Sequence, residues 1–297
     1  ATLYSGSVGS STGVTTIVSS GSGRFRYNSD EGATNYTAGL SSGINVIYRE
    51  QPTVTITANS PAAITYGSAT PTLTTVLSGL QNGDTATQAL ITVATVAVGG
   101  ATSSSVNYIA GPHSLTPSSA VDQLGYALSY STGTLTVDPL ALTGTITTGS
   151  STYGSTLAPG TTSFSNAVSS DALGTATVAV NTTGLLSTSG NLKAGSHSGI
   201  ESVSALSGAD AGNYTFAGVS GNYTVNPLAL TGTAIAGVGT TYATSAAAGA
   251  VTFTNIQGTG LYADDVKSTA SIVSPAYSTS LNLKAGSYDQ TATMISG

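Results

Sequence analysis

The chain has 297 residues, of which only 6% are charged and 39% are hydrophobic, and its formal net charge is −6. This low net charge and the even spread of Val, Ile, Leu and Thr exclude the disordered class, and the absence of cysteine excludes disulfides and thiolate zinc sites. Six basic residues are too few to bind nucleic acid, and no apolar run reaches the ~18 residues that membrane insertion requires.

Residues 1–51 are expected to form a β-rich N-terminal segment. Two stretches in this segment, residues 1–5 and 14–18, are rich in residues that favour strands. The segment also carries the adjacent carboxylates Asp30 and Glu31. Adjacent side chains on a strand point to opposite faces, so this pair is interpreted as solvated turn carboxylates and not as an acid/base dyad.

Residues 52–138 are predicted to be the first complete β-sandwich. Apolar and small polar residues alternate in the runs 53–57 and 134–137, as in strands with one face on a core. Asn82-Gly83-Asp84 is a turn signal, and Asp84 is interpreted as a turn residue that hydrogen-bonds its own backbone.

Residues 139–226 are predicted to be a second sandwich, which begins at Pro139. Proline cannot donate to a strand ladder, so it suits the first residue of a strand that enters a new sheet. Asp210 is again interpreted as a turn residue. Tyr214 and Tyr223 each follow a tight turn at the start of a strand, where a tyrosine hydroxyl can tie the corner of a sandwich.

Residues 227–297 repeat the pattern of the second sandwich. DPLALTGT at 138–145 returns as NPLALTGT at 226–233, Tyr153 and Phe164 return as Tyr242 and Phe253, and NLKAGS returns at 282–287. A more diverged copy begins near residue 51, where Tyr66-Gly67 corresponds to Tyr153-Gly154. The repeat length, between 87 and 91 residues in this sequence, suits an immunoglobulin-like sandwich.

The last copy, 227–297, contains no counterpart of residues 208–225, so it is expected to be an incomplete sandwich. Such a unit exposes an unpaired edge and an open core. Two explanations remain open. Either the natural chain continues and supplies the missing strands, or another subunit donates a strand head-to-tail, with residues 1–18 as the candidate donor. The second explanation would build a fibre.

Several motifs resemble bacterial extracellular modules. ITYGSATPTLTTVLSGLQNGD followed by GTLTV resembles the MBG modules, and PLALTGT with LKAGS and GADAGNYTF resembles the related YDG modules. Both occur in tandem in filamentous-haemagglutinin-like exoproteins. This resemblance implies two-partner secretion, a location outside the cell at the bacterial surface, and a role in an adhesin or surface filament. The motifs are structural, so the resemblance implies no catalytic residues.

Residues with catalytic or ligating chemistry are sparse. His197 corresponds to Tyr288, and His113 lies where the MBG pattern usually has tyrosine, so both histidines are interpreted as half-buried structural residues. Asp264 and Asp265 are interpreted, like the pair at 30–31, as solvated turn carboxylates. No repeated calcium-loop spacing occurs. We therefore expect no catalytic residues, no cofactor and no metal site.

The expected architecture is an all-β, elongated array of tandem immunoglobulin-like sandwiches behind a β-rich N-terminal segment. Its expected function is that of a structural stalk or self-assembling filament segment of a bacterial extracellular adhesin. The expected partners are neighbouring modules of one long chain or further copies of this chain. An alternative function is a module that binds a surface glycan or a host protein through its loops. An enzyme is not expected.

Overall fold

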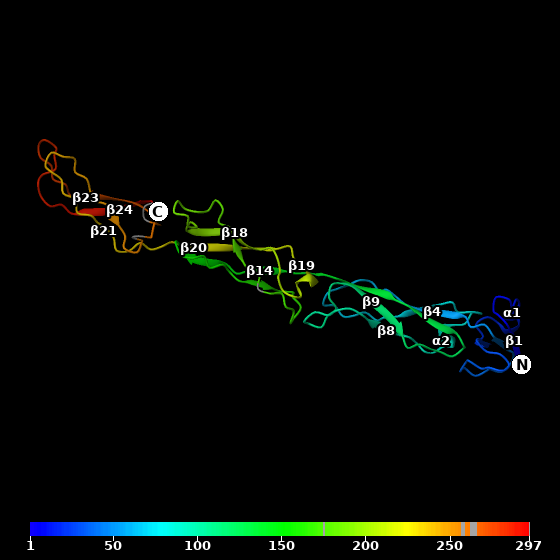
Figure 1. Cartoon of the computed structure of the whole chain (residues 1–297). Coiled ribbons are helices and arrows are strands. Elements are labelled where there is room, and N and C mark those ends of the chain that lie inside the picture. Colours follow the sequence, from blue (N-terminus) through cyan, green and yellow to red (C-terminus); the bar gives the residue numbers. More distant parts are fainter. Residues whose placement is uncertain (175, 257–258, 262–265, 297) are drawn as a thin grey trace. The chain divides into compact units, whose positions relative to one another are not determined.

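The structure, a computed structural model, describes residues 1–174, 176–256, 259–261 and 266–296. Its regular elements are nearly all strands, so the expected all-β fold is confirmed (Figure 1). The described helices are short: α1 (Val14–Val18), α2 (Ala86–Ala89) and the 3-10 turn η1 (Ala211–Asn213). Within the described ranges, no helix has the length and apolar character of a membrane span.

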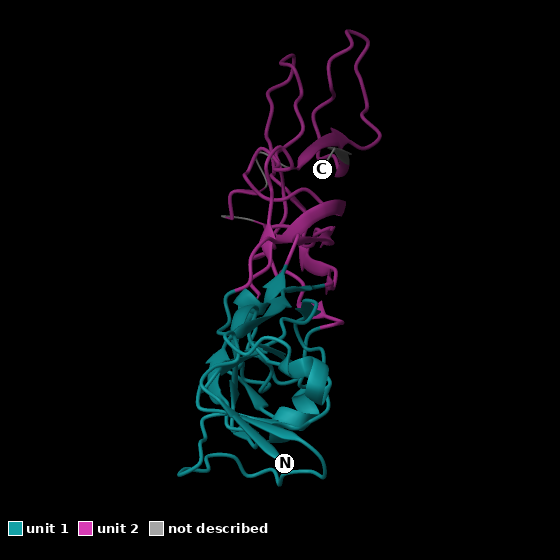
Figure 2. Ribbon diagram, turned by 90° about the vertical axis from the view of Figure 1, so that its right-hand side faces the viewer, with its two compact units in different colours: residues 1–142, 167–174, 207–215 teal, residues 143–166, 175–206, 216–297 magenta. Residues whose placement is uncertain are grey.

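The chain forms two compact units (Figure 2). Unit 1 contains residues 1–142, 167–174 and 207–215, and unit 2 contains residues 143–166, 175–206 and 216–297. These limits differ from the expected boundaries at 51/52 and 138/139. The segments 167–174 and 207–215 belong to unit 1 because their side chains bind residues of 52–138, as described below.

The strands of unit 1 are β1 (Thr2–Ser5), β2 (Phe25–Arg26), β3 (Asn45–Tyr48), β4 (Thr53–Ala58), β5 (Ile64–Thr65), β6 (Thr75–Ser78), β7 (Leu90–Thr92), β8 (Thr95–Val98), β9 (Gly111–Ser118), β10 (Val121–Asp122), β11 (Ala127–Ser131), β12 (Gly133–Asp138), β13 (Leu140–Ala141) and β19 (Tyr214–Thr215). Those of unit 2 are β14 (Gly144–Ile146), β15 (Gly149–Thr152), β16 (Thr162–Phe164), β17 (Ala179–Val180), β18 (Gly195–Val203), β20 (Val219–Asn226), β21 (Ala234–Ile235), β22 (Val251–Thr252), β23 (Lys267–Ile272) and β24 (Gln290–Ser296).

The N-terminal segment is part of the first core. β1 and β2 pair in parallel with β3, whose four residues are all buried. Residues 14–18, whose composition favours a strand, form the helix α1 instead. Val14 and Val18 of this helix pack against the core, and this burial overrides the β-propensity of the stretch.

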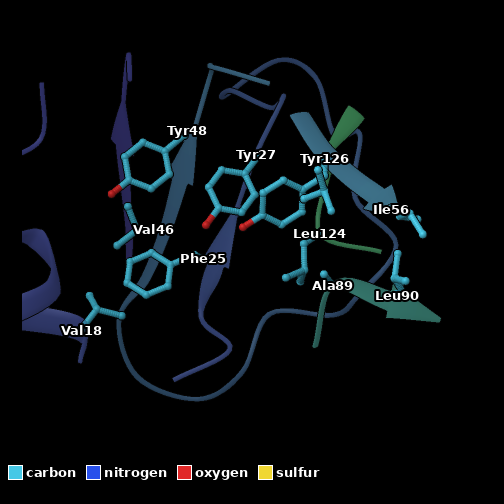
Figure 3. Close-up of a cluster of buried hydrophobic side chains, with 11 residues drawn as sticks. Val18, Phe25, Tyr27, Val46, Tyr48, Ile56, Ala89, Leu90, Leu124 and Tyr126 are labelled. Atoms are coloured by element: carbon cyan, nitrogen blue, oxygen red, sulfur yellow. The ribbon is translucent and has the colours of Figure 1, made fainter. Parts of the chain in front are cut away.

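One hydrophobic core joins residues on both sides of the expected boundary at 51/52. Phe25, Tyr27 and Tyr48 from the N-terminal segment pack with Ile56 and Tyr126. Figure 3 shows the ring of Tyr27 between those of Tyr48 and Tyr126, and their centroids lie 5.7 and 4.4 Å from its own. Removing the N-terminal segment would therefore expose the core of residues 52–138.

Two four-stranded sheets have the same topology. In unit 1 the order is β5-β12-β9-β8, and in unit 2 it is β15-β20-β18-β17. In both sheets the second strand pairs in parallel with the first and antiparallel with the third. This central strand carries buried apolar residues, namely Leu135 and Val137 in β12 and Tyr223 and Val225 in β20. In unit 1, β4 of the sheet β11-β4-β6 lies against β9 and β12, which gives two layers.

The described part of residues 227–297 contains two-stranded sheets. β21 pairs with β22, and β23 pairs with β24, both antiparallel. Val251, Phe253 and Ile256 form the buried core of this region.

Candidate functional site

A carboxylate held by two tyrosine hydroxyls ties the N-terminal segment to residues 52–138. Tyr27 and Tyr126 both donate to Asp84 Oδ2, each at 2.8 Å. The backbone N–H of Gln81 donates to the Tyr126 hydroxyl at 3.0 Å. Asp84 is buried, and it follows the turn that leads into α2. We call these residues the Asp84 cluster.

The same arrangement recurs elsewhere in unit 1. Tyr66 and Tyr214 donate to Asp171 Oδ2 at 2.7 and 2.6 Å, and their rings meet edge to face at 5.4 Å. The backbone N–H of Val168 donates to the Tyr214 hydroxyl at 2.9 Å. We call these residues the Asp171 cluster. Tyr66 follows β5, Asp171 lies in the segment 167–174, and Tyr214 begins β19.

The two clusters correspond by position in the repeat. Asp171 follows Asp84 by 87 residues (171 − 84), and Tyr214 follows Tyr126 by 88 (214 − 126). The fourth member of each cluster, Tyr27 or Tyr66, comes from the stretch of chain that precedes the repeat. Residues 52–138 and 139–226 thus each present an aspartate, held by a tyrosine of the same repeat, to a tyrosine supplied from upstream. The same hydrogen-bonded contact therefore joins two different pairs of chain segments.

Further hydrogen bonds surround the Asp171 cluster. The Asp210 carboxylate accepts the backbone N–H groups of Ser104 and Ala172 at 3.2 and 2.7 Å, and Asn213 Oδ1 accepts that of Ala110 at 2.8 Å. A Cβ on Gly67 would lie 2.8 Å from Val168 Cγ2, so glycine permits this close approach. The segments 167–174 and 207–215 are therefore fastened to residues 52–138 by side-chain acceptors and backbone donors.

The interpretation of Asp84 and Asp210 as turn residues that bond their own backbone is wrong. Both side chains instead accept from groups far away in the chain. The interpretation that Tyr214 and Tyr223 tie corners through their hydroxyls agrees better with the structure. Tyr214 and Tyr223 do tie loops through their hydroxyls, which accept from Val168 and from Ala158, the latter at 2.8 Å. These partners lie 46 and 65 residues upstream, so sequence proximity does not reveal them.

The pKa values of the two aspartates are shifted in opposite directions. Burial raises the pKa of Asp84, and hydrogen bonds from Tyr27 and Tyr126 only partly offset this effect. At Asp171, burial also acts to raise the pKa, but hydrogen bonds from tyrosine and serine hydroxyls outweigh it and the pKa is lowered. Burial raises the pKa of Tyr27, Tyr126 and Tyr214. The phenols therefore stay protonated and act as hydrogen-bond donors.

A second motif, which the sequence analysis missed, supports each repeat's leading tyrosine. A Ser-x-Ser-x-Asn turn places two serine hydroxyls at the phenol oxygen, and its fourth residue is left-handed, with φ of 65°, 80° and 59° at Val106, Gly190 and Leu281. The Tyr66 hydroxyl lies 2.6 and 3.3 Å from the Oγ atoms of Ser103 and Ser105. The Tyr153 hydroxyl lies 2.7 and 3.2 Å from those of Ser187 and Ser189. The Tyr242 hydroxyl lies 3.1 and 3.3 Å from those of Ser278 and Ser280. The recurrence of Ser-x-Ser-x-Asn at the repeat spacing is the feature of the sequence that could have revealed this motif.

Both histidines have structural partners. Nε2 of His113 lies 2.8 Å from the carbonyl oxygen of Ile109, and that of His197 lies 2.7 Å from the carbonyl oxygen of Lys193. Tyr288 donates to the carbonyl of Lys284 at 3.0 Å, also four residues upstream. The exchange of histidine for tyrosine thus preserves one contact, as expected of a structural position. His113 is more buried than expected, with only 3% of its surface exposed.

The carboxylate pair that the structure describes, Asp30 and Glu31, lies beside Arg49. Asp30 accepts two backbone N–H groups of its own turn and lies 3.5 Å from Arg49, which also lies 3.6 Å from Glu31. Asp264 and Asp265 lie outside the described residues. Among the described residues, no three His, Cys, Asp or Glu side chains gather as metal ligands would. A depression of ≈ 250 Å³ bordered by Gly67 and Tyr108 is smaller than usual ligand pockets.

The fold and these clusters define an all-β protein whose polar side chains serve docking between segments of chain. A family model for the MBG domain (YGX type) matches residues 54–136, which include Tyr66-Gly67-Ser68. The MBG domain is a structural module associated with extracellular adhesin-like proteins and is not enzymatic. An MBG-type module in the first half of the chain is thus supported. Searches of curated proteins and of solved structures gave no match.

Proposed function

We propose that the chain is a stalk segment of a bacterial extracellular adhesin of the filamentous-haemagglutinin-like type. In this proposal residues 52–138, 139–226 and 227–297 are successive modules that supply length, and the protein is exported to the cell surface by two-partner secretion. The MBG match over residues 54–136 supports this role.

The Asp171 cluster is the observation that carries the proposal. A stalk needs joints that resist bending, and a covalent linker at Pro139 cannot provide this resistance alone. Here two phenols converge on one carboxylate, while Asp210 and Asn213 accept backbone N–H groups of residues 52–138. Hydrogen bonds to a charged group contribute about 1.5–3 kcal/mol each when they are shielded from water, and less where the group is half-exposed. Together these hydrogen bonds restrict the orientation of the segments 167–174 and 207–215 relative to residues 52–138, as well as their separation.

Neighbouring modules of one long chain are the partners that we propose. Self-assembly through strand donation by the N-terminus receives less support, because β1 already pairs with β3 and residues 14–18 are helical. Self-association through other surfaces remains compatible with a filament.

Spin-label distance measurements test the stalk function. The chain has no cysteine, so the exposed Val93 and Thr183 can be replaced by cysteine and labelled selectively. A stiff joint should give one narrow distance distribution, and Tyr66→Phe with Asp171→Ala should broaden it. Asp138→Asn, at an exposed aspartate, is the matched control. A broad distribution in the unmodified joint, together with specific binding on a glycan or host-protein array, would instead favour a binding module.

A further inference from the structure

Strand β8 is the outer strand of the four-stranded sheet β5-β12-β9-β8 in unit 1 (Figure 1), and its described pairings involve β9 alone. Edge strands are usually protected by a charge, a proline or a bulge, because their free N–H and C=O groups otherwise accept another strand. The run LITVATVAV at 90–98 contains no charge and no proline, and β8 shows no register shift against β9. Ile91 and Val93, which lead into β8, are 64% and 68% exposed. This edge is therefore open to strand addition.

The ladder between β8 and β9 shows which backbone groups of β8 point outward. At the end of this ladder, the N–H of Gly99 donates to the carbonyl oxygen of Ser114 at 2.8 Å. Along an antiparallel ladder, hydrogen-bonded and non-hydrogen-bonded residues alternate. Val96 and Val98 therefore direct their N–H and C=O groups away from β9. Neither residue takes part in the described backbone hydrogen bonds outside the strand ladders.

The side chains of β8 restrict which strand can be added. Thr95 and Ala97 are exposed on one face of the sheet, whereas Val96 and Val98 are half-buried on the other. An added strand must carry apolar residues on the second face, because a register slip of one residue would turn them into water. The run 94–98, Ala-Thr-Val-Ala-Val, has this alternation itself.

We propose that β8 pairs antiparallel with β8 of a second copy of the chain, about a two-fold axis at Val96. In this register Val96 lies opposite its own counterpart, and Ala94 lies opposite the second copy's Val98, so the outward backbone groups bond each other. The half-buried side chains of both copies share one face. On the other face, Thr95 lies opposite the second copy's Ala97. Moving the axis to Ala97 would keep the faces but leave Ala94 outside the pairing.

A second copy suits this edge because each copy presents the uncharged alternating strand that the other requires. The phrase ATVAV recurs at 176–180, where β17 is the outer strand of its own sheet. There the N–H of Asn181 donates to Ile200 at 2.8 Å, so the outward groups fall at the same positions of the phrase. β8 has four residues and β17 has two, so the proposal concerns β8. This lateral contact goes beyond the stalk function, which requires only joints within one chain.

Sedimentation equilibrium of the full chain tests the dimer. A paired edge buries less than a standard interface of roughly 1,600 Å², so we expect weak dimerisation, measured at concentrations up to ~1 mM. Thr95→Lys with Ala97→Lys places like charges opposite each other and should weaken dimerisation at least about tenfold. Thr134→Lys with Thr136→Lys, at exposed positions of β12, is the charge-matched control and should dimerise like wild type. A chain that stays monomeric throughout, or a β8 variant that dimerises like wild type, would overturn the proposal.

Charge reversal tests the register and guards against a lysine variant that merely misfolds. Thr95→Glu with Ala97→Glu should also be monomeric, but an equimolar mixture of the glutamate and lysine variants should form a heterodimer. Thr95→Lys with Ala97→Glu places opposite charges across the axis and should dimerise at least as strongly as wild type. No heterodimer in the mixture would show that β8 does not pair with its own counterpart. Loss of the dimer in the Lys/Glu variant would place the axis elsewhere, and either result would overturn the proposal.

Discussion

Asp84 and Asp171, separated by 87 residues (171 − 84), each accept two tyrosine hydroxyls on one carboxylate oxygen. One tyrosine of each pair belongs to the same repeat as the aspartate, and the other comes from the preceding stretch of chain. The contact that holds the N-terminal segment to residues 52–138 is therefore built like the contact that holds residues 52–138 to the segment 167–174.

The two aspartates should give opposite pH dependence of stability. The pKa of Asp84 is raised, so its contribution is present below the ordinary aspartate value of 3.8 and is lost as the pH rises through its folded pKa. The pKa of Asp171 is lowered, so its contribution is present above 3.8 and is lost as the pH falls through its folded pKa. Urea unfolding from pH 2.5 to 7 measures both effects.

Wild type should lose stability relative to Asp84→Asn as the pH rises, and should gain stability relative to Asp171→Asn over the same range. Parallel curves for the two variants would contradict the assignment of opposite shifts.

The Tyr66–Asp171 hydrogen bond should show coupling in a double-mutant cycle. Tyr66→Phe and Asp171→Ala should each lower the free energy of unfolding by about 1 kcal/mol, because the cluster is partly open to water. The double variant should cost less than the sum by several tenths of a kcal/mol. Asp138→Asn is the control and should cost less than about 0.5 kcal/mol. Strict additivity would show that the two side chains do not act together.

Glu201 should tolerate glutamine but not alanine. It is fully buried, and its two carboxylate oxygens accept the N–H groups of Gly149 and Gly160 at 3.2 and 2.7 Å. Alanine would leave two donors unsatisfied and should cost about 2–4 kcal/mol in chemical denaturation. Glutamine keeps one acceptor oxygen, as Gln290 does for Gly249, and should cost about 1 kcal/mol. Equal costs for the two variants would refute this role.

Gly125 should be far more sensitive to alanine than Gly111. Both have positive φ, +101° and +127°, so backbone strain affects both substitutions. A Cβ at position 125 would collide with the carbonyl oxygen of Tyr27, whereas one at position 111 meets nothing within 4 Å. Thermal unfolding should show a loss of about 1–2 kcal/mol for Gly111→Ala and about 3 kcal/mol or more for Gly125→Ala. Similar losses would mean that the approach of Tyr27 does not constrain the site.

Several features of the chain follow from local pattern alone. Alternation over residues 53–57 and 134–137 correctly indicates strands β4 and β12. The alignment of His197 with Tyr288 indicates an equivalent position, since both side chains contact the same type of backbone carbonyl. These properties are readable because strand periodicity and repeat spacing act over a few residues or are copied from one repeat to the next.

The docking contacts depend on the folded chain. Nothing near Asp84 in sequence indicates that Tyr27 and Tyr126 converge on it, and residues 14–18 have the composition of a strand but form a helix. Such outcomes depend on which distant segments meet, because the free energy of burying Val18 or of satisfying a buried carboxylate exceeds local propensity. A pattern of neighbouring residues carries no information about those partners until the sheets bring them together.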